Sequence, residues 1–203
     1  MRVEFTARLP LLVRSHMITI VSGLPRSGTS LMMQMLVAGG LVGLSDGERK
    51  ADTDNPRGYL EWERIKQLPK DPQCIAEAEG KVVKVISQLL QSLPVGWDYR
   101  VVFMQRPLLE VLKSQDEMLV RRGKYNGSAD LSVIGKAFER HLAQLETWLT
   151  GRPDIAVLKL QYHDVLRGPR ATAETIASFL NTSMDIEAMA SQVDANLYRN
   201  RTT

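Results

Sequence analysis

The chain has 203 residues, of which 44% are hydrophobic and 24% charged, and its formal net charge is +3. This length predicts a single domain with a sizeable core, and the small charge excess argues against a nucleic-acid-binding protein. The single cysteine, Cys74, excludes an intramolecular disulfide and a cysteine-based metal site, and it suits a reducing, cytoplasmic compartment. No apolar run is long enough to cross a membrane, so we expect no membrane partner.

The chain begins with a segment that differs from the rest. Residues 1–16 carry three arginines around a short, broken apolar run, which is not typical of a signal peptide. We therefore predict a poorly ordered extension over 1–16 and a single domain over 17–203.

Apolar runs alternate with amphipathic segments along that domain. The run at 18–22 predicts a strand, and 27–38 predicts a helix that ends at Gly39-Gly40. The polar, turn-rich segment 43–63 is too long for a simple connection, which indicates a lid or a binding loop. The other expected elements are strands at 81–86, 99–104 and 155–160 and helices at 107–121, 131–149, 169–181 and 185–193. This alternation predicts an α/β three-layer sandwich around a central parallel sheet.

The turn between the first strand and the first helix is rich in glycine. It reads Gly23-Leu-Pro-Arg-Ser-Gly-Thr-Ser30, and the order strand, loop, helix is that of a phosphate-binding P-loop in folds like the nucleoside triphosphate hydrolases. Gly23, Gly28 and Ser30 match the motif, but Thr29 stands where those hydrolases have a lysine. Backbone N–H groups, hydroxyls and a guanidinium suit an oxyanion. The expected anion contacts are Pro25, Arg26, Ser27, Gly28, Thr29 and Ser30.

This loop resembles the one that binds the 5′-phosphosulfate end of 3′-phosphoadenosine 5′-phosphosulfate (PAPS) in sulfotransferases, which are P-loop relatives without the kinase lysine. A second segment is similar to the family's 3′-phosphate site, where an arginine ends a strand and a serine follows eight positions later. Here these residues are Arg106 and Ser114. The resemblance implies a P-loop-like fold, PAPS as co-substrate, and contacts from both residues to the 3′-phosphate.

Three further resemblances extend the match. The segment from Leu158 to Pro169 looks like a family segment in which a tyrosine, here Tyr162, contacts the nucleotide. The stretch Asn55-Pro-Arg-Gly-Tyr-Leu-Glu61 resembles an element of small bacterial sulfotransferases, and 197–201 is similar to their basic tail. Together these matches run from residue 17 to residue 201.

The general base departs from the family pattern. Cytosolic sulfotransferases carry K-T-H at the end of the second strand, and that histidine deprotonates the acceptor. The matching run here is Lys84-Val-Ile86, which keeps the lysine and lacks the histidine. Other sulfotransferases use a glutamate after the first helix, and a carboxylate beside a phosphosulfate would suit that task. The candidates on the polar segment are Asp46 and Glu48, then Asp54 and Glu61.

The leading hypothesis is a sulfotransferase that moves a sulfuryl group from PAPS to a hydroxyl or amine of a small-molecule or carbohydrate-like acceptor, without a metal ion. Arg26 and Lys84 are expected to stabilise the charge that develops during transfer. One alternative is a P-loop small-molecule kinase, against which Thr29 argues. The other is a non-catalytic nucleotide-binding protein that kept the fold, an interpretation that the missing strand-two histidine leaves open.

Overall fold

A parallel β-sheet forms the centre of the molecule. The computed structural model describes residues 17–48, 52, 58–121 and 131–194. In these residues the sheet consists of β1 (Met17–Gly23), β2 (Val82–Lys84), β3 (Asp98–Gln105) and β4 (Ile155–Gln161), in the order β2-β1-β3-β4. All neighbouring strands are parallel, and Val21 of β1 is in register with Lys84 on one side and Val102 on the other. The strand that leads into the glycine loop is therefore flanked by β2 and β3.

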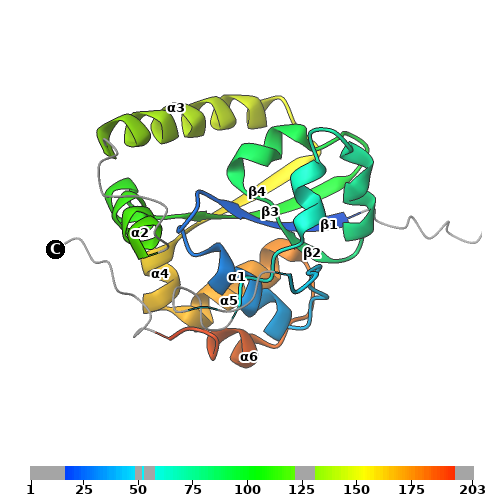
Figure 1. The fold of residues 1–203 in the computed structure, drawn as a ribbon. Coiled ribbons are helices and arrows are strands. Elements are labelled where there is room, and N and C mark those ends of the chain that lie inside the picture. The colour runs from blue at the N-terminus through cyan, green and yellow to red at the C-terminus, as the bar shows by residue number, and fades with distance from the viewer. Residues whose placement is uncertain (1–16, 49–51, 53–57, 122–130, 195–203) are drawn as a thin grey trace, which may run out of the picture.

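Helices cover both faces of this sheet (Figure 1). One face carries α3 (Leu131–Thr150) and three short 3₁₀ helices, which are η1 (Glu63–Gln67), η2 (Pro72–Ala78) and η3 (Ser87–Ser92). The opposite face carries α1 (Thr29–Ala38), α4 (Tyr162–Arg167), α5 (Pro169–Leu180) and α6 (Ile186–Ala190). Helix α2 (Leu108–Arg121) follows β3 and packs beside the N-terminal part of α3.

Two apolar clusters lie between the sheet and these helical layers. Successive side chains of β1 point to opposite faces of the sheet, so Ile18 and Ile20 lie in the cluster beneath α3, whereas Val21 packs toward α1. The methionines of α1 fill the second cluster together with residues of α5, as side chains of their flexibility commonly do. A sheet buried on both faces in this way is the three-layer α/β sandwich predicted from the sequence.

The structure differs from the sequence prediction in several elements. Helix α1 begins at Thr29 rather than near 27, because Gly28 has a φ of 101° and lies outside the helical region. The last helix is shorter than predicted, and α4 and the 3₁₀ helices were not predicted. Elements of five to seven residues with i→i+3 bonding or a single turn show too little periodicity to be recognised in the sequence.

Some sequence predictions fall outside the described residues. These are the extension at 1–16, the candidate base Asp54, the first three residues of the 55–61 element and the basic tail at 197–201. Within the described part of the chain, we find no helix with the length and apolar character needed to cross a membrane.

Candidate active site

The glycine loop joins the carboxyl end of β1 to α1, and both of its glycines are required by close packing. A Cβ atom at Gly23 would lie 2.4 Å from Ser27 Oγ and 2.6 Å from the Met104 carbonyl oxygen. A Cβ atom at Gly28 would lie 2.4 Å from the Tyr162 ring, and φ at Gly28 is positive as well. Contacts this short are sterically forbidden, so both positions demand glycine. The Tyr162 ring therefore packs directly against the glycine loop.

Arg26 is the conformationally unusual residue of the loop. Its φ of 68° places it in the left-handed region, which costs a non-glycine residue about 1–2 kcal/mol. Its carbonyl oxygen accepts a hydrogen bond from Arg106 Nη1 at 3.2 Å, and its own Nε donates to Ser114 Oγ at 2.9 Å. The structure thus brings the three predicted phosphate-binding side chains together, but Ser114 pairs with Arg26 rather than with Arg106.

The first turn of α1 adds backbone N–H donors next to Arg26 in the glycine loop. The first i→i−4 bond of the helix runs from Met32 N to Gly28 O at 3.1 Å, so the amides of Thr29, Ser30 and Leu31 precede the hydrogen-bonded ladder. Ser27 N closes the preceding turn on Leu24 O at 3.2 Å. Backbone N–H groups that make no i→i−4 hydrogen bond, at a helix N-terminus and beside arginine side chains, suit the tetrahedral oxygens of a phosphate or sulfate.

Arg106 lies at the end of β3 in an almost fully buried ion pair. Its Nε donates to Glu110 Oε2 at 2.8 Å, and the two side chains are 8% and 1% exposed. The guanidinium carbon lies 5.0 Å from the centroid of the Tyr162 ring. His163 Nε2 is 3.2 Å from the same carboxylate oxygen of Glu110. Burial raises the pKa of Tyr162, while Arg106 and Arg26 act in the opposite direction.

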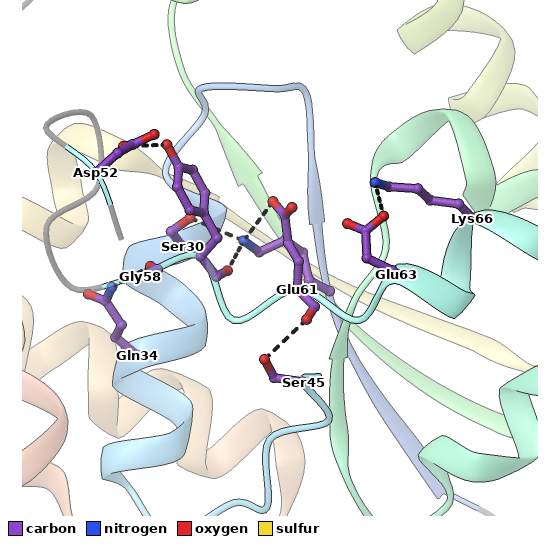
Figure 2. Close-up of polar contacts among 10 residues, drawn as sticks. Ser30, Gln34, Ser45, Asp52, Gly58, Glu61, Glu63 and Lys66 are labelled. Carbon is purple, nitrogen blue, oxygen red and sulfur yellow. Dashed lines mark hydrogen bonds and ion pairs between the residues drawn. The ribbon is translucent and has the colours of Figure 1, made fainter. Parts of the chain in front are cut away.

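Lys84 provides a second buried cation, on the other side of β1. Its side chain is 4% exposed and its Nζ lies 3.1 Å from Ser30 Oγ and 3.5 Å from Glu61 Oε1. The same Nζ donates to the backbone carbonyl of Tyr59. Figure 2 shows Ser30 and Glu61 converging on this centre, Ser30 from α1 and Glu61 from the C-terminal part of the polar segment 43–63. The lysine retained from the family pattern therefore contacts the glycine loop directly.

Residues 58–61, which we call the strap, lie over α1 and Lys84. Gln34 Nε2 of α1 donates to the Gly58 carbonyl at 3.3 Å, and the Tyr59 hydroxyl donates to Asp52 Oδ1 at 2.7 Å. Leu60 has a φ of 47°, a second left-handed non-glycine residue next to the site. Strained backbone of this kind persists only where the surrounding contacts impose it. The strap is thus held in place by its contacts to α1 and Lys84.

The carboxylates predicted as candidate bases occupy different environments. Asp46 accepts backbone hydrogen bonds from Glu48 N at 3.1 Å and Glu63 N at 2.5 Å. The bond from Glu63 is the main reason that the pKa of Asp46 is lowered. Glu48 is exposed. Glu61, 22% exposed, is the carboxylate among these three that contacts Lys84.

Two features of the site were missed in the sequence. Glu110 is not among the predicted site residues, although its position four residues after Arg106 is the spacing of a helical ion pair. The carbonyl of Tyr59 could not be anticipated, because backbone contacts leave no mark on residue type. In the described residues no group of three or more His, Cys, Asp or Glu is placed to hold a metal ion.

Comparison with known proteins places the fold. No family model and no curated protein sequence matches the chain. The sulfotransferase domain of the Synechococcus PCC 7002 olefin synthase aligns with a TM-score of 0.53 and 17% identity, over 91% of this chain and 78% of that one. Mouse sulfotransferase SULT7A1, complexed with PAP, gives 0.54 and 15% over 88% of this chain and 63% of the mouse chain. Sulfotransferase STF1 from Mycobacterium tuberculosis H37Rv gives 0.51 and 15%, over 86% and 70%.

The chain therefore has the P-loop-like α/β fold of sulfotransferases. This confirms the fold class predicted from the strand–loop–helix order. The chain spans less than two thirds of the length of the mouse enzyme.

Proposed function

We propose that this protein transfers a sulfuryl group from PAPS to a hydroxyl or amine. The observation that carries the proposal is the convergence of Arg26, Arg106 and Lys84 on a glycine loop that has no P-loop lysine. The sulfotransferase fold supports it, as does the PAP (adenosine 3′,5′-bisphosphate) complex of the mouse protein that shares this fold.

The donor's two anionic ends would bind to different parts of one connected cluster. The amides of Thr29 and Ser30 and the side chain of Arg26 would hold the 5′-phosphosulfate. Arg106 and Ser114, both hydrogen-bonded to Arg26, would bind the 3′-phosphate. Tyr162, packed behind Gly28 and beneath Arg106, would keep the loop and that guanidinium in place.

The transfer itself would take place between the loop and Lys84. PAPS supplies a sulfuryl group on a good leaving group. The acceptor oxygen or nitrogen forms a bond to sulfur, the bond from sulfur to the 5′-phosphate oxygen breaks, and adenosine 3′,5′-bisphosphate leaves. Lys84 Nζ, buried beside Ser30, would stabilise the negative charge that develops on the departing oxygen.

We propose Glu61 as the group that takes the acceptor proton. Its carboxylate lies 3.5 Å from Lys84 Nζ, so it adjoins the position where transfer would occur. Asp46 is less suited, because both of its oxygens are engaged by backbone amides and its pKa is lowered. The acceptor would be a small or carbohydrate-like molecule that reaches this position past the strap.

A transfer assay separates the candidate functions. PAPS labelled with ³⁵S is incubated with the protein and a panel of phenols, alcohols, amines and saccharides, with and without EDTA. Labelled acceptor, formed equally in EDTA, is the expected result. Binding of adenosine 3′,5′-bisphosphate with no transfer to any acceptor would favour a nucleotide-binding module. Magnesium-dependent turnover of ATP, with no use of PAPS, would favour a kinase.

A further inference from the structure

Glu110 is the most deeply buried acidic side chain near the loop, and its burial needs a reason. It lies on α2, is 1% exposed, and contacts Arg106 Nε at 2.8 Å and His163 Nε2 at 3.2 Å through the same oxygen. A carboxylate is removed from water at a large free-energy cost unless it is paired. Because a carboxylate only accepts hydrogen bonds, Glu110 dictates the orientation of the donors that face it.

The orientation of Arg106 has a consequence in the loop. With Nε committed to Glu110, the guanidinium plane directs Nη1 to the carbonyl oxygen of Arg26, 3.2 Å away. Arg26 is the left-handed residue of the loop, with a φ of 68°. A hydrogen bond to its carbonyl from a charged donor opposes relaxation of that residue into an ordinary conformation.

We propose that Glu110 is a positioning residue, which fixes the Arg106 guanidinium and through it the left-handed conformation of Arg26 in the glycine loop. Arg106 then has two tasks, holding the loop and binding an anion. Glu110 itself lies on α2 and acts through Arg106. The proposal rests on the proposed function only for the nucleotide measurement described below.

The first measurement needs no ligand. Amide hydrogen exchange is followed by NMR at Ser27, whose N–H closes the loop turn on Leu24 O at 3.2 Å, and at the remote amide of Met189 in α6, bonded to Asp185 O at 3.0 Å. In Glu110→Gln the neutral amide keeps the shape and loses the charge. We expect exchange at Ser27 to rise by about tenfold, the effect of weakening a charge-assisted hydrogen bond, with exchange at Met189 unchanged.

The chain offers a matched control. Arg170 and Glu174 on α5 also form an i,i+4 ion pair, but with side chains 63% and 56% exposed, and Arg170 additionally pairs with Glu187 of α6. In Glu174→Gln exchange at Ser27 should not change. Unchanged exchange at Ser27 in Glu110→Gln, or an equal rise at Ser27 and Met189, would overturn the proposal.

A second variant separates positioning from general stabilisation. Replacing a buried ion pair with apolar side chains of similar size commonly preserves stability, so Arg106→Met with Glu110→Leu should unfold at close to the wild-type temperature. The amide exchange rate at Ser27 should nevertheless stay above the wild-type rate, as in Glu110→Gln. A return to the wild-type exchange rate in this double variant would show that the pair supports only the fold, and the same comparison serves if Glu110→Gln does not fold.

The last measurement compares two nucleotides by calorimetry. If Glu110 positions the loop, Glu110→Gln weakens the binding of both AMP and adenosine 3′,5′-bisphosphate, because both present a 5′-phosphate. Weakening of the bisphosphate alone would mean that the pair serves only the 3′-phosphate and would contradict the proposal. If the wild-type protein binds neither nucleotide, the proposed function fails, while the exchange data still decide the role of Glu110.

Discussion

The two buried cations on either side of the glycine loop are compensated in different ways. Arg106, at the end of β3, pairs with a buried carboxylate on the helix that follows it. Lys84, at the end of β2, is held by a hydroxyl of α1, a backbone carbonyl of the strap and the partly exposed Glu61. The ion pair of the first centre lies within one strand–helix unit, with Arg26 and His163 as further contacts. The contacts of the second centre join three separate segments.

This difference suggests that the two centres have different functions. A cation locked to a buried carboxylate is suited to holding a shape, because its orientation is fixed before any ligand arrives. Lys84 donates to two neutral oxygens, and its carboxylate partner Glu61 is partly exposed to water, so the lysine keeps more of its charge effect for an incoming anion. We therefore expect changes at the Lys84 centre to affect the transfer step most, and changes near Arg106 and Tyr162 to affect the conformation of the loop.

The largest effect is expected from Lys84→Met. The variant keeps the stem of the side chain and removes the charge, so the rate of transfer should fall by about 10²–10³-fold, the usual cost of removing one group that stabilises transition-state charge. Initial rates with labelled PAPS measure it. Lys159→Met, at an exposed pair with Glu146, is the control and should keep the wild-type rate. A loss below about threefold in Lys84→Met would place the charge stabilisation elsewhere, because even one weak hydrogen bond is worth about that much.

A smaller loss is expected from Glu61→Gln. The glutamine keeps the size of the side chain but cannot take a proton, so kcat should fall by about 10²-fold, the low end for general-base catalysis. Glu63→Gln, two residues away and paired with Lys66, is the control. Because Glu61 and Lys84 are 3.5 Å apart, their double variant should lose less than the sum of the two effects. Full activity in Glu61→Gln would remove it from the mechanism.

On the Tyr162 side we expect a change in stability. Gly28→Ala adds a Cβ atom 2.4 Å from the Tyr162 ring, whereas Gly40→Ala has a similar φ of 107° with nothing within 4 Å. Both variants bear a conformational cost of about 1–2 kcal/mol, because φ is positive at both positions, and Gly28→Ala should lose about 1–3 kcal/mol more from steric overlap. Urea unfolding measures both. Equal losses of unfolding free energy in the two variants would mean that the Tyr162 ring moves aside and does not hold the loop in place.

The smallest effect is expected from Asp46→Asn, and it depends on pH. The pKa of Asp46 is lowered in the folded protein by the hydrogen bond from Glu63, so its contribution is complete above the ordinary aspartate pKa and is lost as the pH falls below about 4. Because Asp46 is exposed, the loss at pH 7 should be at most about 1 kcal/mol. Chemical unfolding of both proteins at pH 7 and pH 3 tests this. A difference that grows on acidification would contradict it.

The sequence predicted the glycine loop, the strand before it and the fold that surrounds them. Gly23 and Gly28 mark the loop by their spacing, and the β-branched run before them marks β1, since both signals depend only on local backbone requirements. The α/β sandwich followed from the alternation of strands and helices. Lys84 was proposed because it ends a strand at the position that the family pattern gives to a lysine, and the structure brings its Nζ to Ser30 Oγ.

The contacts within the site were less predictable. The hydrogen bond between Arg26 and Ser114 depends on the relative placement of β1 and α2, which no local pattern encodes. The same holds for the choice among Asp46, Glu48 and Glu61, because the path of the segment 43–63 decides which carboxylate meets Lys84. Tyr162 was expected to contact a nucleotide, and the structure adds that it packs against Gly28.

The central place of β1 in the sheet has a consequence for how the protein folds. Met17 pairs with Asp98 on one side, and Thr19 pairs with Val82 on the other, so a chain segment that reaches from Met17 to β3 must be gathered before β1 is flanked by both strands. Parallel pairings this distant in sequence form slowly, because a large chain closure precedes any gain in contacts. The two cations cannot meet at the loop in a partly folded chain. An anion that binds there would select the native state alone, and raising its concentration should raise the unfolding temperature.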